Sequence, residues 1–157
     1  MNILTLNLVA NILVYWIAAR IYLLPKLAQL DPAAVLTPIL LLHATRHLGL
    51  MFLAPGAVYP GMPDNFAIPA AYGDLLAAVL AMIALAGVVT RSRAARPLVW
   101  IFNLEGTVDL VLAIVLGTIH DASPFVGAAY WIPAFWVPAL LVTHAIVFML
   151  LGRRWTL

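Results

Sequence analysis

The sequence predicts an all-α protein that crosses a membrane five times. The first observation behind this prediction is composition: 66% of the 157 residues are hydrophobic and only 9% are charged. A soluble domain of this size cannot bury so much apolar surface. The second observation is that the apolar residues fall into five stretches of about 20 residues, the length at which an α-helix crosses the hydrocarbon core of a bilayer.

The expected spans are separated by segments rich in turn-forming residues. These separators read PKLAQLDP, PGAVYPGMPDNFAIP, RSRAARP and TIHDASPFVG in chain order. Because no long polar segment remains, the sequence predicts a single transmembrane domain over residues 1–157 and no soluble catalytic module. The five spans are expected at about 3–24, 36–58, 69–90, 98–118 and 129–151.

The basic residues predict the orientation of the spans. If the spans alternate in direction, one side collects nearly all the Lys and Arg, with Arg20 close to it, and the other side carries Asp64, His120 and Asp121. Cytoplasmic loops carry the excess of Lys and Arg. We therefore expect an external N-terminus, a cytoplasmic C-terminus and a multi-pass protein of the inner cell membrane. The basic residues on the cytoplasmic side are Lys26, Arg91, Arg93, Arg96, Arg153 and Arg154.

Ionisable side chains within the expected spans are the candidates for function. An arginine at the centre of a span costs about 2.5–3.5 kcal/mol on insertion scales, so such residues normally face the bundle interior and pair with one another. His43 and His47 stand four positions apart and are expected to share one helix face, with Arg46 on its flank. The candidates are His43, Arg46, His47, Asp74, Glu105, Asp109 and His144.

These side chains come from four spans at similar depth, so the sequence predicts one buried polar site. Arg46 is the expected charge partner of Asp74 or Asp109. Such a pair could also lock helices together with no further role, and histidine hydrogen bonds between helices could do the same. Four further in-membrane candidates are Asn7, Asn11, Asn103 and Trp136, of which Asn103 is expected to bond a neighbouring helix.

The first functional hypothesis is a metal or haem centre. The chain has no cysteine, so its ligands would be the nitrogens of His43, His47 and His144 and the oxygens of nearby carboxylates. Such a set suits iron, manganese, zinc or copper(II). In a haem b variant, two histidines would hold the iron and Arg46 would meet a propionate. Either centre would act on a small or lipophilic ligand, and the candidate catalytic groups are Asp74, Glu105 and Asp109.

Three other functions fit the same side chains. Histidines titrate near neutral pH, so the intramembrane histidines and carboxylates could relay protons in a channel or transporter, which with five helices is expected to form a homo-oligomer. Asp74 or Glu105 could instead perform metal-free acid–base chemistry on a lipid or isoprenoid, with Trp136 facing a carbocation. The polar residues could also only pack, in a non-catalytic assembly partner. The small net charge of +2 argues against nucleic acid as a partner.

Four segments resemble a group of small bacterial integral membrane proteins of unassigned function. They are HATRHLGLMFLAPG, FAIPAAYGDL, WIFNLEGTVDL and YWIPAFWVPALLVTHAIVF. The resemblance covers most of the chain. It implies no activity, and it assigns no role to any residue.

Overall fold

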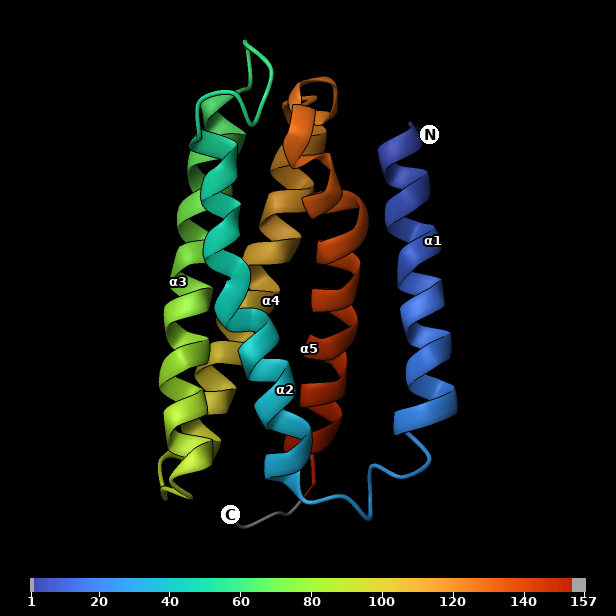
Figure 1. Cartoon of the computed structure of the whole chain (residues 1–157), viewed down its shortest axis with the longest axis vertical. Coiled ribbons are helices and arrows are strands. Elements are labelled where there is room, and N and C mark those ends of the chain that lie inside the picture. The colour runs from blue at the N-terminus through green and yellow to red at the C-terminus, as the bar shows by residue number, and fades with distance from the viewer. Residues whose placement is uncertain (1, 154–157) are drawn as a thin grey trace.

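Five long helices run side by side along one axis in the computed structural model, which describes residues 2–153 (Figure 1). Each is long and apolar enough to cross a membrane, and no strand occurs among the described residues. This confirms the prediction of an all-helical chain with five helices of spanning length. Arg154, one of the expected cytoplasmic basic residues, lies outside the described residues.

Several of the five long helices are extended by turns of other helical types. The α-helices are α1 (Ile3–Ala18), α2 (Pro32–Ala44), α3 (Asp64–Val89), α4 (Ala95–Ile119) and α5 (Val137–Leu151). The π-helix η1 (Ala19–Leu23) continues α1, the 3₁₀-helix η2 (Thr45–Leu53) continues α2, and the π-helix η5 (Ile132–Trp136) leads into α5. The short 3₁₀ turns η3 (Ser123–Phe125) and η4 (Gly127–Tyr130) connect α4 to η5.

Three helices begin earlier than the sequence predicts: α4 by three residues, at Ala95, and α2 and α3 by more. α2 begins at Pro32 because Asp31 caps it, with its side chain accepting a hydrogen bond from the Ala33 amide at 3.2 Å. Proline suits this first position because its ring already holds the helical φ angle. α3 begins at Asp64 and includes Pro69, since a proline near a helix start removes only one backbone hydrogen bond.

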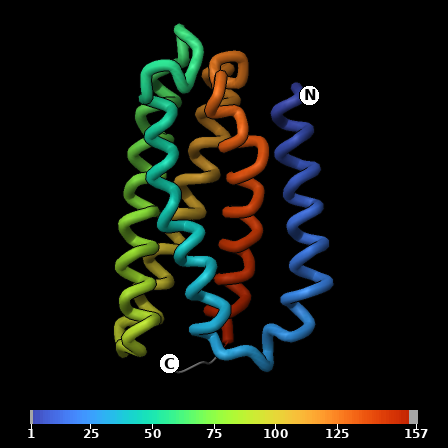
Figure 2. Tube along the Cα trace, in the orientation of Figure 1, coloured from blue at the N-terminus to red at the C-terminus, as the bar shows by residue number. Residues whose placement is uncertain are grey.

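α1 stands at the edge of the bundle, beside α5 (Figures 1 and 2). None of its residues is buried. The amide of Asn7 donates to the Tyr130 hydroxyl at 3.0 Å, and the amide of Asn11 donates to the Ala134 carbonyl at 2.8 Å. This pair of asparagines therefore attaches α1 to η4 and η5, and does not join the ionisable side chains at the centre of the bundle.

The other four helices pack closely because α3 presents a face of small residues. α3 contacts both the α2–η2 helix and α4, and small side chains let helix backbones approach one another. Two clusters of large apolar residues fill the bundle, one toward each end. Along α4, for example, Phe102 belongs to the first and Leu110 to the second, and the polar residues lie between them. The small buried residues of α3 are Ala67, Ala70, Ala71, Ala77, Ala78, Ala81, Ala84 and Gly87.

Candidate functional site

Arg46 is the centre of the buried polar residues, and its side chain is completely inaccessible. Its Nε donates to Asp74 Oδ1 at 2.7 Å, and its Nη2 donates to Asp109 Oδ2 at 2.5 Å. Its Nη1 donates to the carbonyl oxygen of Gly106 at 3.2 Å. Every nitrogen of the guanidinium is therefore used, and the side chain ties η2 to both α3 and α4. We call Arg46, Asp74 and Asp109 the ion cluster.

The change from α-helix to 3₁₀-helix at Thr45 decides which residues of this span point inward. In a 3₁₀-helix, side chains three positions apart lie directly above one another. His43, Arg46, Gly49 and Phe52 are all buried in this way. His47 is exposed instead, and among the described residues its ring makes a hydrogen bond only with the backbone carbonyl of Ala44. The expectation that His43 and His47 share a face is therefore wrong, because it assumed α-helical spacing.

Three glycines from three different helices leave room for the ion cluster. A Cβ atom on Gly49 would overlap the carboxylate of Asp74, and one on Gly73 would overlap the carboxylate of Asp109. A Cβ on Gly106 would lie 2.7 Å from Arg46 Nη1 and 2.7 Å from His144 Cε1. Real Cβ atoms do not approach so closely, so these positions require glycine if the cluster keeps its geometry.

His43 and His144 lie beside the ion cluster with their rings in contact, at a centroid separation of 4.3 Å. The Thr143 hydroxyl donates to the Ala139 carbonyl at 2.9 Å, so it accepts from His43 Nε2, which is also 2.9 Å away. His43 Nδ1 is then an unprotonated acceptor, and it is buried without a hydrogen-bond partner. The ring of His43 is thus oriented by α5.

His144 is oriented by Asn103, as the expected role of that asparagine implied. The Asn103 amide nitrogen donates to the His144 carbonyl at 3.3 Å, so its oxygen faces His144 Nδ1 at 2.7 Å and accepts from it. The remaining ring nitrogen, Nε2, is an acceptor that faces Arg46 Nη1 at 3.4 Å. The lone pair that His144 would offer a metal therefore faces a cation.

The geometry around His43 and His144 bears on the metal and haem hypotheses. No group of three His, Asp or Glu side chains within residues 2–153 is placed to hold one ion. The position in front of His144 Nε2 is taken by the guanidinium of Arg46. The rings of His43 and His144 touch, so no porphyrin fits between them. The metal and haem hypotheses gain no support from this geometry.

Glu105 lies one helical turn from Asp109 and is close enough to interact electrostatically with both Arg46 and Asp74. Its Oε2 atom is buried and has no hydrogen-bond partner. Arg46 thus pairs with two carboxylates, and a third, that of Glu105, lies one turn from Asp109 along α4. If all three were ionised, two negative charges would be unbalanced in a region of low dielectric, where an unpaired charge is costly.

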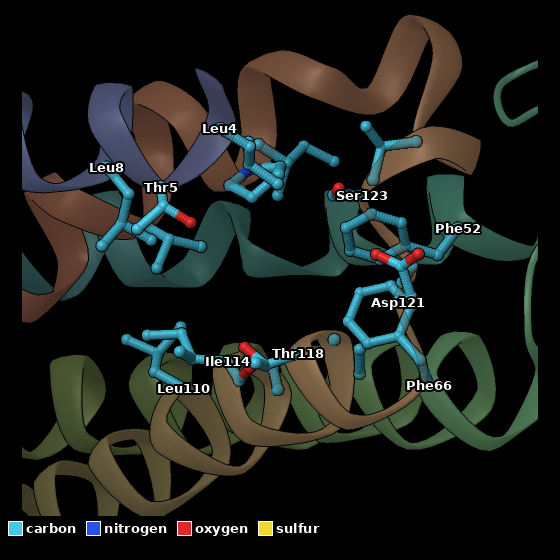
Figure 3. Close-up of a pocket in the computed structure, with 18 of the residues that line it drawn as sticks. Leu4, Thr5, Leu8, Phe52, Phe66, Leu110, Ile114, Thr118, Asp121 and Ser123 are labelled. Atoms are coloured by element: carbon cyan, nitrogen blue, oxygen red, sulfur yellow. Dashed lines mark hydrogen bonds between the residues drawn. The ribbon is translucent and has the colours of Figure 1, made fainter. Parts of the chain in front are cut away.

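A cavity of about 250 Å³ runs along the helices and ends at Asp74. Its wall includes Phe66, Ala70 and Asp74 from successive turns of α3. In Figure 3, Leu4, Thr5 and Leu8 of α1 face Leu110, Ile114 and Thr118 of α4 across this space, and Asp121 and Ser123 lie toward one end. The lining is mostly apolar, and Asp74 is the member of the ion cluster that reaches it.

A family model described as a domain of unknown function (DUF8737) matches residues 3–152. The chain belongs to the DUF8737 family. Comparison with curated proteins gave no match, and neither did comparison with solved structures. The family description names no activity, so the geometry of this DUF8737 chain is the basis for its proposed function.

Sequence reasoning on this DUF8737 chain missed Thr143, the three glycines and the cavity. The sequence does not mark Thr143 as a site residue, because threonines are common in apolar spans. The three glycines cannot be told apart from the small residues that let helices pack closely. Trp136 lies edge-on to Trp131 at 5.9 Å and is not part of the cavity wall. Its indole nitrogen is buried without a hydrogen-bond partner.

Proposed function

We propose that the protein binds a small lipophilic ligand within the membrane, in the cavity that ends at Asp74. Ligand sites in proteins are typically concave and mostly apolar, with a few polar groups that fix the orientation of the ligand. The cavity has this character, with apolar walls along most of its length and a carboxylate at its inner end.

The observation that carries the proposal is the double role of Asp74. Its Oδ1 accepts from Arg46, and its side chain keeps 11% of its surface accessible, whereas the Arg46 side chain keeps none. Of the three residues of the ion cluster, Asp74 is the one that lines the cavity, so a ligand there would meet the cluster at Asp74. Any acid–base or binding event in the cavity would be transmitted to Arg46 and Asp109 through this carboxylate.

A second candidate function, proton-linked transport, is favoured by the excess of carboxylates around Arg46. Two uncompensated charges are costly inside the bundle, so these carboxylates would retain a proton or a cation. A ligand that binds at Asp74 would compete with that proton or cation. A proton gradient across liposomes holding an entrapped pH-sensitive dye is then expected to collapse faster with the native protein than with Asp74→Asn. Equal rates for native, variant and empty liposomes would remove this candidate.

We propose further that the N-terminus is external and the C-terminus cytoplasmic, in the inner cell membrane. Basic residues gather in the α1–α2 and α3–α4 connections, at the opposite end from Asp121, and cytoplasmic loops carry this excess. Cysteines introduced at the exposed positions Asp64 and Arg93 will react with an impermeant thiol reagent from opposite sides of the membrane. Labelling of both from one side would refute the orientation.

Filling the cavity tests ligand binding directly. Ala113 lines the cavity, whereas Val115, on the same helix, is 45% exposed and does not. In lipid nanodiscs, we expect saturable binding of the neutral probe 4-phenylbutanol above the background of empty nanodiscs. Ala113→Phe should abolish that binding because the new ring occupies the cavity, and Val115→Phe should preserve it. Equal binding by both variants would contradict the proposal.

A further inference from the structure

We infer that the ligand of this cavity is a lipophilic amine, an apolar molecule with a cationic head, and that the head binds the free carboxylate oxygen of Asp74. The inference rests on the proposed function, because it names the chemical class of the ligand for the same cavity. It follows from the charges along the cavity wall, from the hydrogen bonds of Asp74 and from the length of the cavity.

The part of the cavity wall that the described residues form carries negative groups and no basic ones. Asp74 lies at its inner end and Asp121 lines it as well, while the polar groups between them include the hydroxyls of Thr5 and Thr118. Within residues 2–153, no Lys or Arg side chain is part of the wall. An anionic ligand would be repelled by these carboxylates, whereas a cationic head would be attracted by them.

One oxygen of the Asp74 carboxylate is available to accept hydrogen bonds from a ligand. Its Oδ1 accepts from Arg46 Nε, but among the described residues no group donates a hydrogen bond to its Oδ2. The Oδ2 atom lies against Gly49, where the absence of a side chain leaves it space. An ammonium group can donate up to three hydrogen bonds, and hydrogen bonds between charged groups are about twice as strong as neutral ones.

The charge of the cluster also favours a cation over a neutral head. The Arg46 guanidinium pairs with the carboxylates of Asp74 and Asp109, and Glu105 lies one helical turn from Asp109 on α4. A bound ammonium would bring a second positive charge to the cluster, which a neutral hydroxyl cannot do. If the cluster holds a proton when the cavity is empty, the ammonium would displace it, so binding of the amine would release a proton.

The α3 wall of the cavity gives a length for a suitable probe. Phe66 and Asp74 line it from positions eight residues apart on α3, which corresponds to about 12 Å along the helix axis. A phenyl ring with a four-carbon chain and a terminal amine is of this length. 4-Phenylbutylamine is therefore a suitable probe, and 4-phenylbutanol is its neutral counterpart of equal length.

The test compares these two probes on the native protein in nanodiscs, with empty nanodiscs as the background. We expect the amine to bind at least about tenfold more tightly than the alcohol, as one charge-assisted hydrogen bond provides. Asp74→Asn should make the two affinities equal. Asp109→Asn removes the same charge from the ion cluster at a residue that does not line the cavity, so it should weaken the preference for the amine without abolishing it.

The outcomes separate this inference from the proposed function. If alcohol and amine bind the native protein equally tightly and Ala113→Phe abolishes both, the cavity binds lipophilic ligands but the amine assignment is wrong. If Ala113→Phe leaves the binding of both unchanged, the proposed function itself fails. Comparing the two probes on the native protein requires no variant, so the inference can be overturned even if Asp74→Asn does not fold.

Discussion

Replacing Arg46 by leucine will lower the free energy of unfolding by about 3–5 kcal/mol, the usual cost of removing one partner from a buried ion pair. The variant would leave Asp74 and Asp109 buried without their shared cation. Unfolding by sodium dodecyl sulfate in mixed micelles, followed by circular dichroism, measures the change. The size of the effect depends on the complete burial of the guanidinium.

Arg91 provides the matched control for this substitution. It also pairs with an aspartate, Asp31, at 3.5 Å, but both side chains are more than half exposed. Exposed pairs contribute about 0–1 kcal/mol, so Arg91→Leu should change the stability little. Adding Asp74→Asn and Asp109→Asn to Arg46→Leu should recover much of the loss, since the two carboxylates that paired with Arg46 no longer carry a charge. Equal stability of Arg46→Leu and the native protein would show that the ion cluster does not hold the bundle together.

Gly106→Ala will destabilise the protein by about 1–3 kcal/mol, the range typical of an overpacked core. The added methyl group would press against Arg46 Nη1 and His144 Cε1. Neither neighbour can move freely, because two carboxylates hold the guanidinium and Asn103 holds the imidazole. The same unfolding measurement applies to this variant.

Gly152 is the control for the glycine substitution. A Cβ on Gly152 would meet its nearest neighbour, a backbone oxygen, at 3.5 Å, an ordinary contact. Gly152→Ala should therefore leave the stability nearly unchanged. If Gly106→Ala is as stable as Gly152→Ala, the space between α4 and Arg46 can hold a methyl group. The ion cluster would then not need glycine at position 106.

The five helices could be predicted from the sequence because a bilayer demands stretches of about 20 apolar residues, and such stretches stand out in a chain with few charges. The ion cluster was predictable for a related reason: an arginine and several acids inside apolar spans need one another. The sequence does not decide which of the two acids pairs with Arg46, and in the structure Arg46 pairs with both Asp74 and Asp109.

The inward face of the second span was not predictable. Assigning His47 to the site required α-helical spacing beyond Thr45, and the change to 3₁₀ geometry is not visible in the pattern of apolar residues. The cavity was equally inaccessible to sequence reasoning. It depends on how far α1 stands from α3 and α4, which is determined by contacts between distant residues such as Asn7 and Tyr130.

The proposed binding of a lipophilic ligand beside Asp74 is tested most directly by photolabelling. The small neutral carbene precursor 3-trifluoromethyl-3-phenyldiazirine would be activated with the native protein in nanodiscs, and labelled residues would be identified by mass spectrometry. We expect saturable labelling at Ala70 and Leu110, which line the cavity, and loss of that labelling in Ala113→Phe. Labelling confined to the outward-facing residues Val108, Val111 and Val115 would contradict a ligand site in the cavity.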